Sequence, residues 1–91
     1  MNKFTLQIVT PQGLLYEGEA EKIILRTTEG DVGILAKHAD YIAALGTGAA
    51  RLFSDGKERK ATCSGGMVSV ADGVVRVVAS VFRWADEADA H

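Results

Sequence analysis

The chain has little of what several large classes of protein require, and cysteine is the clearest case. Its 91 residues include one cysteine, Cys63. A single cysteine excludes an internal disulfide framework and a multi-cysteine metal site, so Cys63 is predicted to be a core or interface residue. The longest apolar stretch, residues 74–82, is interrupted by Arg76 and Ser80 and is shorter than the ~20 residues of a membrane helix. The first residues alternate polar and apolar side chains, unlike a secretory signal. These absences predict a chain on the cytosolic side that does not itself span a bilayer.

The chain also lacks an excess of positive charge and is poor in aromatic residues. Its 10 Lys and Arg stand against 12 Asp and Glu, and Phe, Trp and Tyr make up 7% of the residues. Nucleic-acid binding draws on a basic stripe that neutralises phosphates and, for single strands, on aromatic rings that stack against bases. Nucleic acid is therefore not expected as a partner.

The nucleophiles of the chain lie outside any catalytic motif. His38 and Asp40 could in principle join Ser64 or Cys63 in a triad, as in a small hydrolase, but neither nucleophile sits in a Gly-x-Ser-x-Gly pattern. Such combinations arise freely by chance. The sequence therefore predicts no catalytic residue.

Cofactor and metal sites are not predicted either. Neither Gly-x-x-x-x-Gly-Lys-Ser/Thr nor Gly-x-Gly-x-x-Gly occurs, and Gly56-Lys57 is followed by Glu58, whose charge would repel a phosphate. The two histidines, His38 and His91, have no paired cysteines with which to form a metal site.

What the chain does have is apolar residues that alternate with polar ones. With 47% hydrophobic residues it can form one compact domain with its own core. A period of two predicts half-buried strands. The alternating sets are Phe4, Leu6 and Ile8; Ile23 and Leu25; Val68 and Val70; and Val75, Val77, Ala79 and Val81. The opposite, more mixed face of the last strand is expected to carry Val74, Arg76, Val78 and Ser80.

Turn-forming residues separate these segments at short, regular intervals, which favours a sandwich or barrel of antiparallel strands. They occur at residues 11–13, 29–31, 46–48, 54–56, 64–66 and 72–73. Asp-Gly is a favoured two-residue hairpin turn because both positions accept left-handed dihedral angles. Two hairpins are therefore predicted, one pairing residues 51–54 with 57–63 and the other pairing 67–71 with 74–82.

These patterns predict an all-β protein, an antiparallel β-sandwich of about ten short strands over residues 1–84. No long window repeats the i, i+3, i+4 spacing with caps at both ends, so a long internal helix is not expected. Residues 85–91 form a short acidic tail that could begin a helix or fray. Trp84 is expected to act as a lid over an open sheet edge, and the alternative is an interface anchor.

Four motifs in a fixed order resemble the N-terminal β-sandwich domain of the epsilon subunit of F-type ATP synthases. They are Phe4-Thr-Leu-Gln-Ile-Val-Thr-Pro11, Tyr16-Glu-Gly18, Glu29-Gly-Asp-Val-Gly-Ile-Leu35 followed by His38-Ala39, and Ser64-Gly-Gly-Met67 with the strand 74–81. Each motif alone is weak, but four in the right order at compatible spacing are specific. The resemblance covers residues 4–84, and Asp40 stands where the family commonly has proline.

The resemblance implies a non-catalytic rotor subunit of a proton-translocating synthase that couples the gamma shaft subunit to the membrane c-ring. The subunit would associate peripherally with the cytoplasmic face of a bacterial inner membrane and bind no cofactor. Family members usually continue into a helical hairpin that binds ATP or acts as a brake. Residues 85–91 would be the stub of this hairpin, so the inhibitory function is expected to be absent. The implied c-ring contacts are Thr10, Glu29, Asp31 and His38, and the implied gamma contacts are Tyr41, Ile42, Met67, Val78 and Ser80.

Each implied contact has a plainer alternative. Asp31 could be a solvated turn acid, His38 could hydrogen-bond within its own turn, and the apolar residues could pack in the core. For the chain as a whole, the alternative to a rotor subunit is an independent small β-barrel binding module.

Overall fold

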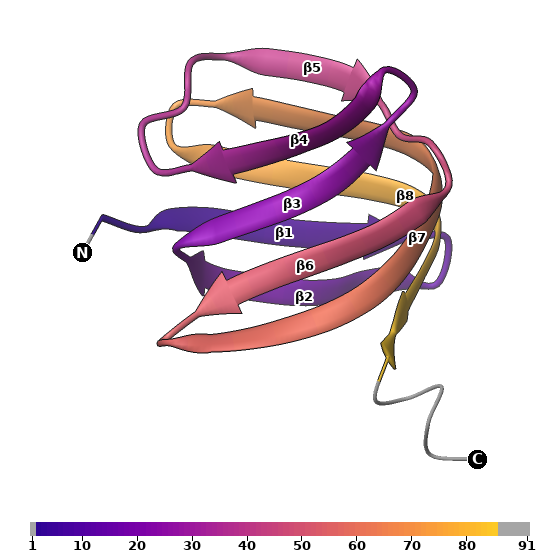
Figure 1. Cartoon of the computed structure of the whole chain (residues 1–91), viewed down its shortest axis with the longest axis horizontal. Helices are drawn as coiled ribbons and strands as arrows, with labels where there is room; N and C mark the ends of the chain where they lie inside the picture. The colour runs from indigo at the N-terminus through magenta and orange to yellow at the C-terminus, as the bar shows by residue number, and fades with distance from the viewer. Residues whose placement is uncertain (1, 86–91) are drawn as a thin grey trace.

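The computed structural model describes residues 2–85, which fold into eight β-strands (Figure 1). The strands are β1 (Phe4–Thr10), β2 (Gly13–Ala20), β3 (Lys22–Thr27), β4 (Gly30–Leu35), β5 (Tyr41–Ala44), β6 (Gly48–Ser54), β7 (Lys57–Ala71) and β8 (Val74–Trp84). The all-β prediction is confirmed. Residues 86–91 of the predicted tail lie outside the described residues. Within residues 2–85, no helix is long and apolar enough to cross a membrane.

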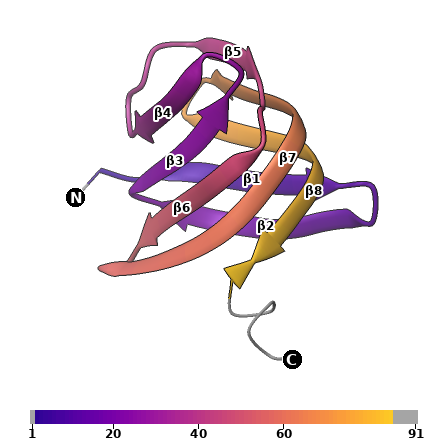
Figure 2. The ribbon, with the colours of Figure 1, turned by 45° about the vertical axis from the view of Figure 1, so that its right-hand side comes forward.

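The strands form two packed layers, and the long strands β7 and β8 run through both of them (Figures 1 and 2). The first layer contains β5, the second half of β7, the first half of β8, β1 and β2. The second layer contains β4, β3, β6, the first half of β7 and the end of β8. Because β7 and β8 each contribute one segment to each layer, the eight strands form ten strand segments. This accounts for the difference from the predicted number of about ten strands.

Both predicted Asp-Gly hairpins are confirmed. Asp55 and Gly56 have φ angles of 52° and 73°, and Asp72 and Gly73 have φ angles of 53° and 77°, as a tight two-residue turn requires. One pairing departs from the antiparallel prediction, because β1 lies parallel to β8 in the first layer.

The core lies between the layers and is made by the inward side chains of every long strand. Leu6 and Ile8 of β1, Leu25 of β3 and Val77 of β8 are all completely buried. Burying a side chain of this size contributes about 1.5–3 kcal/mol, so these alternating residues supply most of the force that holds the layers together. Cys63 belongs to the same core.

The bend of β7 from one layer into the other occurs at Gly65 and Gly66. We predicted a turn there, and the positive φ angles are confirmed, but residues 64–66 do not separate two strands, because β7 continues and pairs with β8 on both sides of the bend. The two glycines have φ angles of 70° and 102°, in a region that side-chain-bearing residues rarely adopt. A Cβ on Gly66 would lie 1.9 Å from the backbone oxygen of Val78, so the neighbouring strand leaves room only for hydrogen.

The bend also changes which residues face the core. On β8, Val75, Val77 and Ala79 are buried, but beyond the bend the buried residues are Phe82 and Trp84. Val81 is 49% exposed, so its predicted place on the inner face is wrong. The period of two is shifted by one residue because the strand enters the second layer at this point.

We expect Gly66→Ala to lower the free energy of unfolding by about 2–5 kcal/mol, because the new Cβ adds a backbone clash to an unfavourable φ angle. Gly56→Ala is the matched control, since Gly56 also has a positive φ but its Cβ would meet nothing within 4 Å. This control should lose about 1–2 kcal/mol. Urea unfolding of both variants checks the difference, and equal stability would contradict the assigned role of the bend.

Candidate docking surfaces

The outer face of the first layer carries a continuous row of apolar side chains across all five of its strand segments. Cross-strand pairing joins Ala44 to Met67, Met67 to Val78, Val78 to Val9 and Val9 to Leu14. We call these five residues the apolar row. Met67, Val78 and Leu14 are 47%, 45% and 58% exposed. Large side chains gathered on one face in this way mark an interaction surface, whereas scattered ones do not.

A second row lies beside the apolar row on the same face and is mostly polar. The same pairings align Ile42, Ser69, Arg76, Gln7 and Glu17, which we call the polar row. Arg76 donates from Nε to Gln7 Oε1 at 3.1 Å, and Gln7 donates from Nε2 to Glu17 Oε2 at 2.8 Å. The outer face therefore combines an apolar strip with one ordered chain of hydrogen bonds.

The five residues predicted to contact gamma do not all lie on this face. Ile42, Met67 and Val78 do, and Ser80 is exposed where β8 bends. Tyr41 is half-buried instead, because it packs on the core and its ring meets His38 edge-on at 5.5 Å between centroids. Val9 and Leu14 also belong to the row but were not predicted, because their places in it depend on pairing between distant strands.

The turn between β3 and β4 is held by a hydroxyl group. Thr27 is buried, and its Oγ1 donates to the Gly30 oxygen at 2.7 Å and accepts from the Glu29 backbone nitrogen at 3.1 Å. Both backbone groups of the turn are thereby paired within the chain. The exposed carboxylate of Glu29 is presented on an ordered turn.

Asp31 lies beside this turn and already has a partner. Its Oδ1 accepts from Nε of Arg26 at 2.6 Å, and the two residues are cross-strand neighbours on β3 and β4. Both side chains are about half exposed, so the pair contributes little to stability. A basic group on a partner would have to compete with Arg26 for Asp31.

The four predicted ring contacts do not form one patch. Thr10 orders the β1–β2 turn, because its Oγ1 accepts a hydrogen bond from the backbone nitrogen of Gln12 at 3.2 Å. That turn and the β3–β4 turn lie at the same end of the sandwich, on the right of Figure 1. The β4–β5 loop, which contains His38, lies at the opposite end, so one docking end cannot include all four residues. His38 Nδ1 is 2.7 Å from the Ala39 oxygen, within its own loop.

The outer face of the second layer is basic. Its outward positions, which alternate with buried neighbours, include Lys22, Arg26, Arg51, Lys60 and Arg83 against Asp31 and Glu58. A hydrogen bond from Arg51 holds the pKa of Glu58 below its ordinary value. Lys22 and Arg51 both lie over the Phe53 ring, at 5.6 and 5.3 Å from its centre. The two outer faces of the sandwich therefore differ in character.

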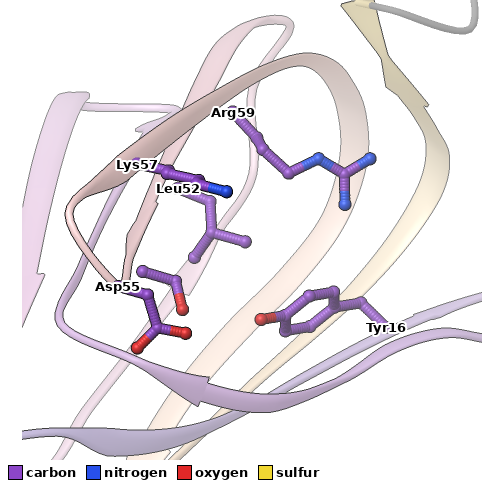
Figure 3. Close-up of a pocket in the computed structure, with 6 residues that line it drawn as sticks. Tyr16, Leu52, Asp55, Lys57 and Arg59 are labelled. Atoms are coloured by element: carbon purple, nitrogen blue, oxygen red, sulfur yellow. The ribbon is translucent and has the colours of Figure 1, made fainter.

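A cavity of about 270 Å³ opens between β2 and the β6–β7 hairpin (Figure 3). It is lined by Tyr16, Leu52, Ser54, Asp55, Lys57 and Arg59. Asp55 is paired with Lys3, and Arg59 stacks on Trp84 at 3.7 Å. Trp84 is buried between Tyr16 and Phe82, as a lid on this edge would be. Two of the charged groups of the cavity, Asp55 and Arg59, are thus engaged in contacts within the chain.

The residues of the possible triad are not assembled. Cys63 is buried, and burial raises the pKa of its thiol, which disfavours a thiolate nucleophile. The hydroxyl group of Ser64 bonds Thr47 Oγ1 at 2.8 Å, while the ring of His38 bonds its own loop. Among residues 2–85, no three of His, Cys, Asp and Glu are grouped as metal ligands.

Comparison with known families gives one clear match. Residues 3–85 match the model of the family described as ATP synthase, Delta/Epsilon chain, beta-sandwich domain. The ATP synthase epsilon chain of Ruminococcus albus is 42% identical over 90 residues, which are 98% of this chain and 67% of that protein. The epsilon chain of Alkaliphilus oremlandii is 41% identical over 86 residues, covering 94% of this chain and 64% of that protein. The chain thus spans about two thirds of the length of these relatives.

Two solved structures that resemble this chain also come from ATP synthases. A chain of the Euglena gracilis mitochondrial ATP synthase, solved with OSCP, F1 and the c-ring, has a TM-score of 0.87 at 26% identity. The superposition covers 93% of this chain and 55% of that one. A chain of the Tetrahymena thermophila mitochondrial ATP synthase, from its central stalk and c-ring, has a TM-score of 0.74 at 18% identity and supports the fold.

We expect Thr27→Val to free the β3–β4 turn and to lower the free energy of unfolding by about 1–2 kcal/mol, because two backbone groups lose their partner. Thr27→Ser keeps the hydroxyl group and serves as the control. Hydrogen exchange of the Glu29 amide should accelerate in the valine variant and stay slow in the serine variant. Unchanged protection of this amide in Thr27→Val would show that the hydroxyl group does not order the turn.

Proposed function

The chain belongs to the delta/epsilon chain family of ATP synthases, and on this basis we propose that it is a non-catalytic rotor subunit that joins the gamma shaft subunit to the c-ring. The main structural observation in support of this proposal is the apolar row on the outer face of the first layer. The family assignment also argues against an independent β-barrel binding module.

The apolar row is the proposed docking surface for gamma. Its residues lie on strands rather than loops, so their positions are set by backbone pairing before any partner binds. A preformed surface loses little conformational entropy on docking. Met67 and Val78 lie at its centre, with Ile42 beside them in the polar row. Tyr41 supports this edge from the core side, and Ser80 lies at its margin.

The end that carries the β1–β2 and β3–β4 turns is the proposed contact with the c-ring. Glu29 is exposed there on a turn whose backbone is already ordered, and Thr10 lies at the other turn of this end. A rim ion pair of this kind contributes about 0.2–1 kcal/mol and serves mainly to set the register. For Asp31 to contact the ring, a basic group of the ring would have to displace Arg26, and a contact through His38 would lie at the opposite end.

The proposed mechanism is mechanical. A sandwich whose core is filled by interlocking side chains resists deformation, so torque on one surface is passed to the other. No bond is made or broken in this subunit, and catalysis would belong to other subunits of the synthase. The chain would be held peripherally at the cytoplasmic face of a bacterial inner membrane through this complex.

We expect Val78→Asp to weaken binding to the gamma subunit from the same genome by at least about 10-fold, because it buries a charge in an apolar contact. Val81→Asp is the matched control, since Val81 has a similar exposure on the same strand but lies beyond the bend. Isothermal titration with purified gamma gives both affinities. Equal affinities of the two variants would argue against the apolar row as the docking surface.

We expect Glu29→Lys to weaken the binding of the complex between this chain and gamma to isolated c-rings by about 1.4- to 5-fold at low salt. This fold-change corresponds to the free energy of an exposed ion pair. The effect should fade as salt screens the charges. Asp40→Lys, in the exposed loop at the opposite end, makes the same charge change and should not alter binding. A larger effect of Asp40→Lys than of Glu29→Lys would reverse the assignment of the two ends.

A further inference from the structure

We propose that Arg76 determines the specificity of the docking face by pairing with a carboxylate on the partner. The inference rests on the proposed function, in which the partner is the gamma subunit, and adds a chemical requirement for the surface of that partner. Arg76 is also the one Lys or Arg among the described residues that form the strands of the first layer.

Arg76 is held in place before a partner binds. Its Nε donates to Gln7 Oε1 at 3.1 Å, and Gln7 in turn donates from Nε2 to Glu17 at 2.8 Å. The three residues are direct neighbours on β8, β1 and β2. An exposed arginine otherwise loses considerable rotamer entropy when it is fixed, so this arrangement lowers the cost of a contact through Arg76.

The hydrogen bond to Gln7 uses one of the five N–H donors of the guanidinium group. Among the described residues, the two terminal nitrogens of Arg76 have no acceptor in the structure. These nitrogens form the fork that binds a carboxylate through two parallel hydrogen bonds. Arg76 can therefore keep its bond to Gln7 and still bind an acidic side chain.

The position of Arg76 makes such a pair necessary for tight docking. Arg76 is two residues from Val78 on β8, or about 7 Å along the strand, so a partner that covers the apolar row also covers Arg76. Glu17 lies two strands away, and the amide group of Gln7 stands between its carboxylate and the guanidinium group, so the two charges do not form a direct ion pair. A covered arginine without a counter-charge opposes binding, so the partner must supply one.

The surroundings of Arg76 favour a protein carboxylate over a lipid phosphate. Anionic membranes and polyanions are bound by clusters of several basic residues, whereas this face presents one arginine beside an apolar strip. An apolar core with a single ordered charge is the composition of a protein–protein interface. The basic outer face of the second layer lies on the other side of the molecule.

The test is a titration of purified gamma into the wild-type chain and into Arg76→Met, Arg76→Lys and Arg83→Met. Arg76→Met should lower the affinity about 10- to 100-fold, because the partner carboxylate is left unpaired. Arg76→Lys should recover part of the loss, since a single ammonium group cannot form the two-bond fork. Arg83→Met removes an exposed arginine from the second layer and should leave the affinity unchanged.

A positioning role is tested by Gln7→Met, which keeps Arg76 but removes its support, and a loss of about 3-fold is expected. The salt dependence of the affinity should become shallower in Arg76→Met, which a purely structural effect would not cause. Binding of Arg76→Met within 2-fold of wild type would overturn this inference while leaving the gamma contact intact. Failure of the wild-type chain to bind gamma would overturn the proposed function as well.

Discussion

The close passage of two backbones at Gly66 is the constraint on which the rest of the structure depends. At this point β7 leaves one layer and enters the other, and the backbone oxygen of Val78 occupies the space where a Cβ would be. Because the bend leaves β7 paired with β8 on both sides, one hairpin serves both layers. The two layers are thereby joined by continuous hydrogen-bonded backbone as well as by the core between them, as the proposed transmission of force requires.

The same bend gives the molecule two different outer faces. Before the bend, the outward residues of β8 are Arg76 and Val78, which lie in the polar and apolar rows. After it, they are Val81 and Arg83, on the basic face of the second layer. One strand thus contributes to a face suited to docking and to a face suited to solvent. The turns that would meet the ring lie at a third surface, at the end of the sandwich, so the proposed contacts with gamma and the c-ring do not compete.

Much of this architecture could be predicted from local patterns, and the exceptions have physical causes. The alternation of Val75 and Val77 and the Asp-Gly turns follow from the geometry of single strands and hairpins, so they were predicted correctly. The bend at Gly65 and Gly66 could not be told from a turn, because both use the same glycine conformations. The place of Val9 and Leu14 in the apolar row depends on pairing between distant strands and on a register shift after Ile8. The position of the His38 loop, at the end opposite the β3–β4 turn, could not be predicted for the same reason, because the end of a sheet at which a loop lies is a property of the topology.

In the proposed function, the outer face of the first layer docks on gamma, and the other proposed contacts depend on this docking. Thiol labelling of introduced cysteines tests this docking, since the native Cys63 is buried and its raised thiol pKa keeps background labelling low. Val78→Cys and Val81→Cys would be labelled with and without gamma. We expect gamma to protect position 78 from labelling and to leave position 81 reactive. Protection of position 81 alone, or of neither position in a complex that has formed, would contradict it.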